Sequence, residues 1–288
     1  MFKFIETGFD DTVVYKGLTI HRTKVSDGYY HIKLAGESLT VSLKMEKDLD
    51  LLGLPYLTYM YRKKDIDPYF SDLWNYMIFI LAKSFRDYYV VLNEQTFEIL
   101  EKTDLYDKYE ESYIKEFERL KKYIEKPSAT MTGVNMIQEK ILDLENKMYN
   151  RTVFNETEFD EIRDIICTIN GFDNTEYDPK WEFKLLKAKE VADNASHDKE
   201  GLTITDLVES LAFYLRKLPH ELKDMSYYTF NHYVKMMGEY DEYLLCRTAQ
   251  LQGTEFKESI KHWLSHYTPK GKYDDLVTQN ASAIKSVQ

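Results

Sequence analysis

The chain has 288 residues, a formal net charge of −11 and an isoelectric point of about 5.2. Hydrophobic residues make up 43% of it and aromatic residues 15%, which is too apolar for an intrinsically disordered chain. Because so acidic a surface repels phosphate backbones, we expect no nucleic-acid partner. The two cysteines, Cys167 and Cys246, lie far apart and share no ligand spacing, which indicates a reducing compartment and no disulfide framework.

No segment of the sequence predicts a membrane span. The longest uncharged run, LWNYMIFILA at 73–82, is well short of the roughly 20 residues that a helix needs to cross a bilayer. The N-terminal MFKFIETGFDD turns acidic early and has no apolar core, so no secretion signal is expected. We therefore expect a protein without a membrane partner.

The first third of the chain predicts a small β-meander followed by a buried helix. The turn-forming SDG and AGE separate three runs of β-branched and aromatic residues: VVYKGLTIHR (13–22), YYHIKL (29–34) and SLTVSLKM (38–45). After a break at 65–68, an apolar run predicts a helix over 73–85. The runs YYVVLN and TFEIL flank a short turn and predict one more hairpin over 88–100.

From about Leu105 the apolar residues recur at helical spacing. Steps of three and four residues join two stripes, Tyr106, Tyr109, Tyr113, Phe117, Leu120 and Ile124 in the first, and Val134, Ile137, Ile141, Leu144 and Met148 in the second. Two helices of similar length joined by a short loop pack most simply as an antiparallel αα-hairpin. The sequence leaves open whether this hairpin, at 105–149, packs inward or projects as an arm.

Two further helices and a linker are predicted before the C-terminal third. The first helix covers 157–169, with Asn155 or Thr157 as its cap and Gly171 just past its end. The second covers 179–192 and contains Trp181. The polar stretch VADNASHDKEG at 191–201 is the predicted linker.

These patterns predict an α+β fold that is mostly helical. A small N-terminal β-meander precedes a helical body with an αα-hairpin, and a C-terminal helical domain follows the linker. The predicted divisions are 1–103 for the β-meander and helix module, 104–192 for the helical hairpin region and 203–288 for the C-terminal helical domain.

The C-terminal third predicts three helices. The run TDLVESLAFYLRKL carries one apolar face and stops at Pro219. Ser226 is the predicted cap of the next helix, in which Gly238 marks an end or a kink. Thr254 is the predicted cap of the last one, which would bury Phe256, Ile260 and Trp263.

The stretch KHWLSHY at 261–267 raises the question of a metal site. His262 and His266 are four residues apart, so one helix face could present both, but the glutamate that a zincin HExxH motif needs is replaced by Trp263. We interpret Trp263 as a core anchor, and a metal-dependent enzyme built on these histidines is the least favoured alternative. The sequence has no G-x-S-x-G elbow and no GxGxxG loop, so no catalytic residues, no metal and no cofactor are predicted.

Surface aromatics give a more informative signal. The stretch YYTFNHYVKMM at 227–237 places aromatic rings on two faces beside two methionines, a composition typical of a groove that accepts an apolar partner helix. The residues predicted to bind a partner are Tyr227, Phe230, Tyr233, Met236, Met237 and Trp263. The alternative is plain core packing, above all for Phe230 and Trp263.

The layout of residues 203–267 resembles the C-terminal part of tail and baseplate assembly proteins from phages of low-GC Gram-positive bacteria, including tail assembly chaperones. Three segments carry the resemblance: LPHELKDMSYYTFNHYVKMM, DEYLLCRTAQLQG and IKHWLSHY. It implies a morphogenesis factor of the host cytoplasm that binds a helical tail protein such as the tape measure, without catalytic residues or cofactor. The alternative is a structural virion component of the tail or baseplate, which would remain in the particle and self-assemble; homo-oligomerisation is open in both cases.

Overall fold

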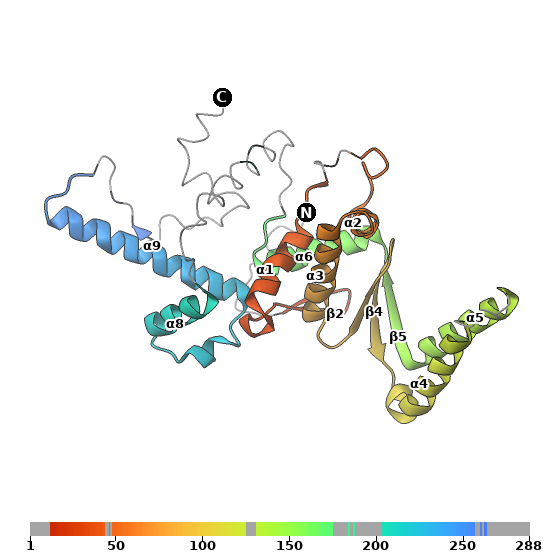
Figure 1. Cartoon of the computed structure of the whole chain (residues 1–288). Helices are drawn as coiled ribbons and strands as arrows, with labels where there is room; N and C mark the ends of the chain where they lie inside the picture. The colour runs from red at the N-terminus through yellow and green to blue at the C-terminus, as the bar shows by residue number, and fades with distance from the viewer. Residues whose placement is uncertain are drawn as a thin grey trace.

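The computed structural model describes residues 12–43, 46, 48–124, 131–174, 184, 187, 203–256, 260, 262 and 263. Within them, the chain is a mostly helical α+β protein with an N-terminal β-hairpin and a three-stranded antiparallel sheet (Figure 1). The predicted fold class is therefore confirmed. Of the helix predicted over 179–192, residues 184 and 187 are described and both are helical, whereas Trp181 and the predicted linker at 191–201 lie outside the described residues. The three-part division of the chain stays a prediction.

The first predicted β run, 13–22, is two strands. Strand β1 (Thr12–Tyr15) pairs antiparallel with β2 (Leu18–His21), and Tyr15 faces Leu18 across the turn. Lys16 and Gly17 both have positive φ, 49° and 83°, as a two-residue type I′ turn requires. Because glycine follows the lysine, only one side chain has to adopt the left-handed conformation.

Helices α2 (Tyr56–Lys64) and α3 (Pro68–Ser84) lie on either side of the predicted break. Asp67 caps α3 by accepting a hydrogen bond of 3.0 Å from the backbone N–H of Tyr69, and Pro68 occupies the first turn, where its missing N–H costs nothing. The predicted helix over 73–85 is confirmed and begins five residues earlier than expected.

Strands β3 (Tyr89–Leu92), β4 (Phe97–Lys102) and β5 (Tyr149–Phe154) form the antiparallel sheet in the order β3-β4-β5. The β3–β4 pair confirms the hairpin predicted over 88–100. Strand β5 was not predicted, because its partner β4 is far away in the sequence. One face of the sheet buries Phe97, Ile99 and Phe154 in the core.

Helices α4 (Asp104–Ile124) and α5 (Met131–Met148) form the predicted αα-hairpin, which is inserted between the paired strands β4 and β5. The backbone N–H and the hydroxyl of Thr103 both donate to the carbonyl of Met148 at 3.0 Å and close the root of the hairpin. Figure 1 shows the two helices leaving the body at the end of the sheet. The hairpin is thus a projecting arm, which answers the question that the sequence left open.

Helix α6 (Glu156–Asn170) confirms the prediction over 157–169. Asn155 is its cap and accepts a hydrogen bond of 3.0 Å from the N–H of Glu158, whose carboxylate in turn accepts from the N–H of Asn155. Gly171 ends the helix in the left-handed conformation, with φ of 72°, and the N–H of Phe172 donates to the carbonyl of Cys167.

The predicted strand at 29–34 is wrong, because this segment belongs to helix α1 (Tyr29–Leu39). The predicted strand at 38–45 is also wrong as far as it is described, since it contains the end of α1 followed by irregular residues to 43. The buried residues of α1 recur at helical spacing and pack against α3 and α6; they include Ile32, Ala35 and Leu39. Burial of this stripe outweighs the strand preference of the aromatic and β-branched residues.

Helix α8 (Ile204–Leu215), the 3₁₀ turn η3 (Pro219–Leu222) and helix α9 (Tyr227–Leu251) form the C-terminal unit. Ser226 caps α9 as predicted, accepting from the N–H of Thr229 at 3.1 Å. Gly238 neither ends α9 nor terminates its hydrogen bonding, since the helix continues to Leu251.

The α-helix predicted to begin at Thr254 is wrong for the residues described. Residues 254–256, 260 and 262 are irregular, and Trp263 lies in a 3₁₀ turn. The side chain of Phe256 is exposed rather than buried. A short amphipathic helix depends on burial of its apolar face, and Phe256 does not gain that burial.

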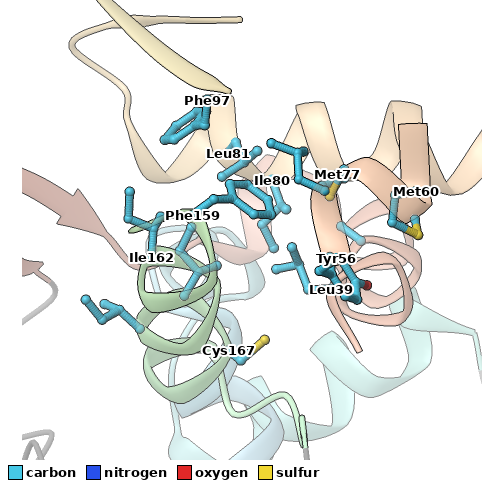
Figure 2. Packing of buried hydrophobic residues seen from close by; sticks show 14 of the residues in the cluster. Leu39, Tyr56, Met60, Met77, Ile80, Leu81, Phe97, Phe159, Ile162 and Cys167 are labelled. Atoms are coloured by element: carbon cyan, nitrogen blue, oxygen red, sulfur yellow. The ribbon is translucent and has the colours of Figure 1, made fainter. Parts of the chain in front are cut away.

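Two hydrophobic clusters hold the described chain together. The larger one joins β2, α1, α2, α3, the sheet and α6, and Figure 2 shows Phe159 and Ile162 of α6 facing Ile80 and Leu81 of α3. The smaller one lies between α8, η3 and α9 and is built on Leu211, Ala212, Leu222 and Phe230. Helix α6 therefore packs with the N-terminal elements, although the arm separates it from them in the sequence.

Gly36 of α1 is a close-packing position against Phe172, the residue that follows Gly171 at the end of α6. A Cβ added at Gly36 would lie 2.7 Å from the ring of Phe172. The same ring contacts Tyr227, the first residue of α9, at a centroid distance of 5.8 Å. The absence of a side chain at Gly36 therefore allows α1, the end of α6 and the start of α9 to meet.

We expect Gly36→Ala to destabilise the protein. Overpacking against Phe172 should cost about 1–3 kcal/mol, more than the roughly 1 kcal/mol by which alanine favours a helix over glycine. The matched control is Gly238→Ala in α9, where a Cβ would meet no atom of the described chain within 4 Å and stability should stay equal or rise. Urea-unfolding midpoints of both variants test this, and an unchanged midpoint for Gly36→Ala would contradict the packing.

Candidate partner-binding surface

The N-terminal end of α9 is anchored in the protein and is not a free surface. Phe230 is fully buried in the smaller cluster, and Tyr227 is buried between Tyr29 and Phe172, with ring centroids 5.2 and 5.8 Å away. The backbone N–H of Tyr227 also donates to the carbonyl of Thr23 at 2.8 Å. Two of the six residues predicted to bind a partner therefore fix the helix in place.

The other four predicted residues are half-buried. Tyr233 packs against the smaller cluster, next to Val234, while Met236 and Met237 follow one turn later on α9. Trp263 lies edge-on against Tyr240 of α9, with ring centroids 5.4 Å apart and planes at 78°. The structure thus places all six residues on or against α9, without gathering them into one open groove.

One apolar stripe runs the whole length of α9. Phe230, Met237, Leu244 and Leu251 recur every seven residues, which keeps them on one side of a helix. Exposure rises along the stripe, from full burial at Phe230 to 43% at Leu244 and 89% at Leu251. The neighbouring Leu245 is 75% exposed. The stripe is therefore covered by the protein at its start and uncovered at its end.

Helix α8 covers the first half of this stripe and stops near the middle of α9. Tyr214, in the last turn of α8, contacts Tyr240 edge-on at a centroid distance of 6.3 Å. We define the candidate surface as Leu244, Leu245 and Leu251, which lie within two turns of one another on α9. Exposed large apolar side chains close together are typical of interaction sites. Phe213 and Leu218 are also exposed, at and after the end of α8, and are not part of this surface.

The charges beside the candidate surface are of both signs. Asp241 and Glu242 are exposed on α9, while Arg247 lies over the ring of Tyr243 and donates to the side chain of Gln250 at 3.0 Å. Arg216 and Lys217 are exposed just after α8. In protein interfaces a mixed rim of this kind gives orientation and association rate more than affinity, and buried apolar side chains give most of the binding energy.

Three observations bear on catalysis and metal binding: the positions of the two histidines, the arrangement of metal-ligating side chains and the state of Cys167. His262 is exposed and lies 5.4 Å from the ring of Tyr243, whereas His266 is outside the described residues. Among the described residues, no group of three or more His, Cys, Asp or Glu side chains has the geometry to hold a metal. Burial raises the pKa of the Cys167 thiol to about 12, so this cysteine stays protonated near neutral pH and is a poor nucleophile.

No family model, curated protein or solved structure matches the chain. In the part of the chain that the structure describes, no helix is long and apolar enough to cross a membrane. The exposed end of the α9 stripe is not among the residues predicted from the sequence, and the seven-residue recurrence of Phe230, Met237, Leu244 and Leu251 is the signal that points to it. That recurrence predicts a face but not which part of the face is covered.

We expect Phe230→Ala and Leu245→Ala to differ sharply in stability. Emptying the buried site of Phe230 should lower the free energy of unfolding by about 3–5 kcal/mol, whereas truncating the exposed Leu245 should change it by no more than about 0.5 kcal/mol. Guanidinium-induced unfolding of the full chain measures both values. Similar losses of unfolding free energy in the two variants would show that the division of α9 into an anchored and an exposed half is incorrect.

Proposed function

We propose that this chain is a non-enzymatic binding protein that holds an apolar helix of a partner protein on α9. The observation that carries the proposal is the rise in exposure along the α9 stripe, which ends at the largely exposed Leu251, with the exposed Leu245 beside it. The partner is a phage tail protein of the tape-measure kind, and the chain acts as a tail assembly factor in the host cytoplasm. No cofactor takes part in this role.

A helical partner suits the form of the candidate surface. All backbone donors and acceptors in the interior of α9 are used within the helix, so a partner cannot add a strand to it and has to dock side chain against side chain. Apolar residues seven apart lie on one side of a helix, where a second helix that runs alongside can contact each of them in turn.

The assignment to phage morphogenesis rests on the resemblance of residues 203–267 to tail and baseplate assembly proteins. The candidate surface on α9 lies within that segment. A long tail protein with exposed apolar helices would aggregate before it polymerises, and a binding protein that covers one apolar face would keep it soluble. The acidic net charge of −11 helps a complex of this kind to remain dispersed.

We expect the double variant Leu245→Glu/Leu251→Glu to lose partner binding while keeping its fold. Two carboxylates buried unpaired in an apolar contact should weaken the complex on the order of a hundredfold. The experiment co-expresses the full chain with the tape-measure protein of the same genome and measures how much partner stays soluble and co-purifies. A matched control, Val14→Glu/Ile66→Glu, alters two similarly exposed apolar residues away from α9.

Circular dichroism melting separates loss of binding from loss of fold. The proposal predicts unchanged melting for both double variants and loss of the complex only with the α9 variant. A complex that survives Leu245→Glu/Leu251→Glu would contradict the α9 assignment, and a tape-measure protein that never binds the unaltered chain would contradict the holding role.

A structural component of the tail or baseplate is the second candidate. The observation that favours it is the projecting α4–α5 arm, since an arm of this form can reach a neighbouring subunit in a ring (Figure 1). Mass spectrometry of purified virions distinguishes the two roles. Stoichiometric presence in the particle supports the structural component, and absence supports the assembly factor.

A further inference from the structure

The outer face of the β3-β4-β5 sheet is unusually apolar for a surface in contact with solvent. The opposite face of the sheet lies on the core, and in such antiparallel sheets the second face is normally polar. Here the strand register aligns Val91, Glu98 and Val153 in one row and Tyr89, Leu100 and Arg151 in the next. Tyr89, Val91 and Val153 are exposed.

A cavity of about 230 Å³ opens on this face at the root of the α4–α5 arm. Its apolar walls are Val91, Leu100 and Tyr149, and its polar groups are Asn93, Glu98, Arg151 and, from the last turns of α5, Glu145. The volume is below the 300–1,000 Å³ typical of small-molecule sites and equals that of about eight waters. The cavity therefore has the size of one long side chain rather than of a cofactor.

The polar groups of the cavity carry one more negative than positive charge. Arg151 pairs with both carboxylates, Nη1 at 3.3 Å from Oε2 of Glu98 and Nη2 at 3.0 Å from Oε2 of Glu145. Oε1 of Glu98 accepts from the amide of Asn93 at 3.1 Å. Among the described groups, none donates to Oε1 of Glu145. The site thus has a spare acceptor and a net negative charge, which favours a ligand that is cationic and donates hydrogen bonds.

The aromatic wall suits a cation as well. The ring of Tyr149 packs against Tyr89 and Tyr106, with centroids 5.9 and 5.5 Å away. The same ring cluster already holds an ammonium group of the chain, because Nζ of Lys102 lies 4.3 Å from the centroid of Tyr106 and 5.5 Å from that of Tyr89. An anion would meet two carboxylates, and the guanidinium of Arg151 is already paired with both of them.

We propose that this cavity binds a lysine or arginine side chain of a partner protein. The cationic head donates to Oε1 of Glu145, the aliphatic stem lies against Tyr149 and Leu100, and apolar residues beside it cover the exposed Val91 and Val153. This second interaction surface involves none of the residues of the α9 surface, so its test is independent of the function proposed above.

The test uses full-length protein with labelled Val and Leu methyl groups and follows the Val91 and Leu100 signals by NMR. The probes are Nα-acetyl-lysine methylamide and Nα-acetyl-arginine methylamide, with Nα-acetyl-norleucine methylamide as the neutral control and putrescine as a free cation. We expect saturable shifts with the two capped cationic residues, with dissociation constants on the order of 1 mM, since a single side chain binds weakly. The neutral control should cause no saturable shift.

The matched variants are Glu145→Gln, which removes the spare acceptor charge, and Glu139→Gln, which removes an exposed charge on the same helix. The first should weaken binding roughly fivefold or more and the second should leave it unchanged, because only Glu145 faces the cavity. Equal melting temperatures establish that both variants fold. The proposal is overturned if the capped cationic residues do not saturate, if norleucine binds as well, if putrescine alone binds, or if the two variants behave alike.

Discussion

The side-chain oxygen of Asn170 accepts two hydrogen bonds from Thr23, and the N-terminal core and the C-terminal unit meet around this buried contact. The backbone N–H of Thr23 lies 3.0 Å from Oδ1 of Asn170 and its hydroxyl lies 2.7 Å from the same atom. The amide of Asn170 donates in turn to the carbonyl of Ile166 at 2.9 Å. Both residues are buried, and a buried polar pair is stable only when its groups are satisfied, as they are here.

The direction of α9 follows from this contact. The segment that begins at Thr23 also pairs with the chain just before α9: the N–H of Val25 donates to the carbonyl of Met225, and that of Ser26 donates to the carbonyl of Lys223, both at 3.0 Å. From the other side, Arg86 donates to the carbonyl of Arg22. Backbone hydrogen bonds, which do not depend on the side-chain pattern, thus fix the position at which α9 starts. Because α9 is much longer than α8, Leu251 at its end lies past the part of α9 that α8 covers.

The sequence predicts a structural feature well when that feature depends on residues that are close together in the chain. The caps of α6 and α9 are local hydrogen bonds between neighbouring residues: the prediction of Ser226 is confirmed, and Asn155 is one of the two caps predicted for α6. Helix α1 was mistaken for a strand and β5 was missed, because burial against distant elements decides both. For the candidate surface, the pattern indicates that Phe230 shares a face with Leu251, but only the position of α8 determines that the first is buried and the second exposed.

In the α4–α5 arm, each helix buries its apolar stripe against the other helix. Helices α4 and α5 carry stripes with the same spacing of three and four residues, and they pack together so that Leu120 and Met148 are buried. Because only residues 125–130 separate the two helices in the sequence, each has its partner at a high effective concentration, and pairing costs little entropy. The C-terminal half of α9 carries Leu244 and Leu251 seven residues apart on one side, and no element of the described chain covers Leu251. A helix from another molecule would complete for α9 the packing that the arm achieves within itself.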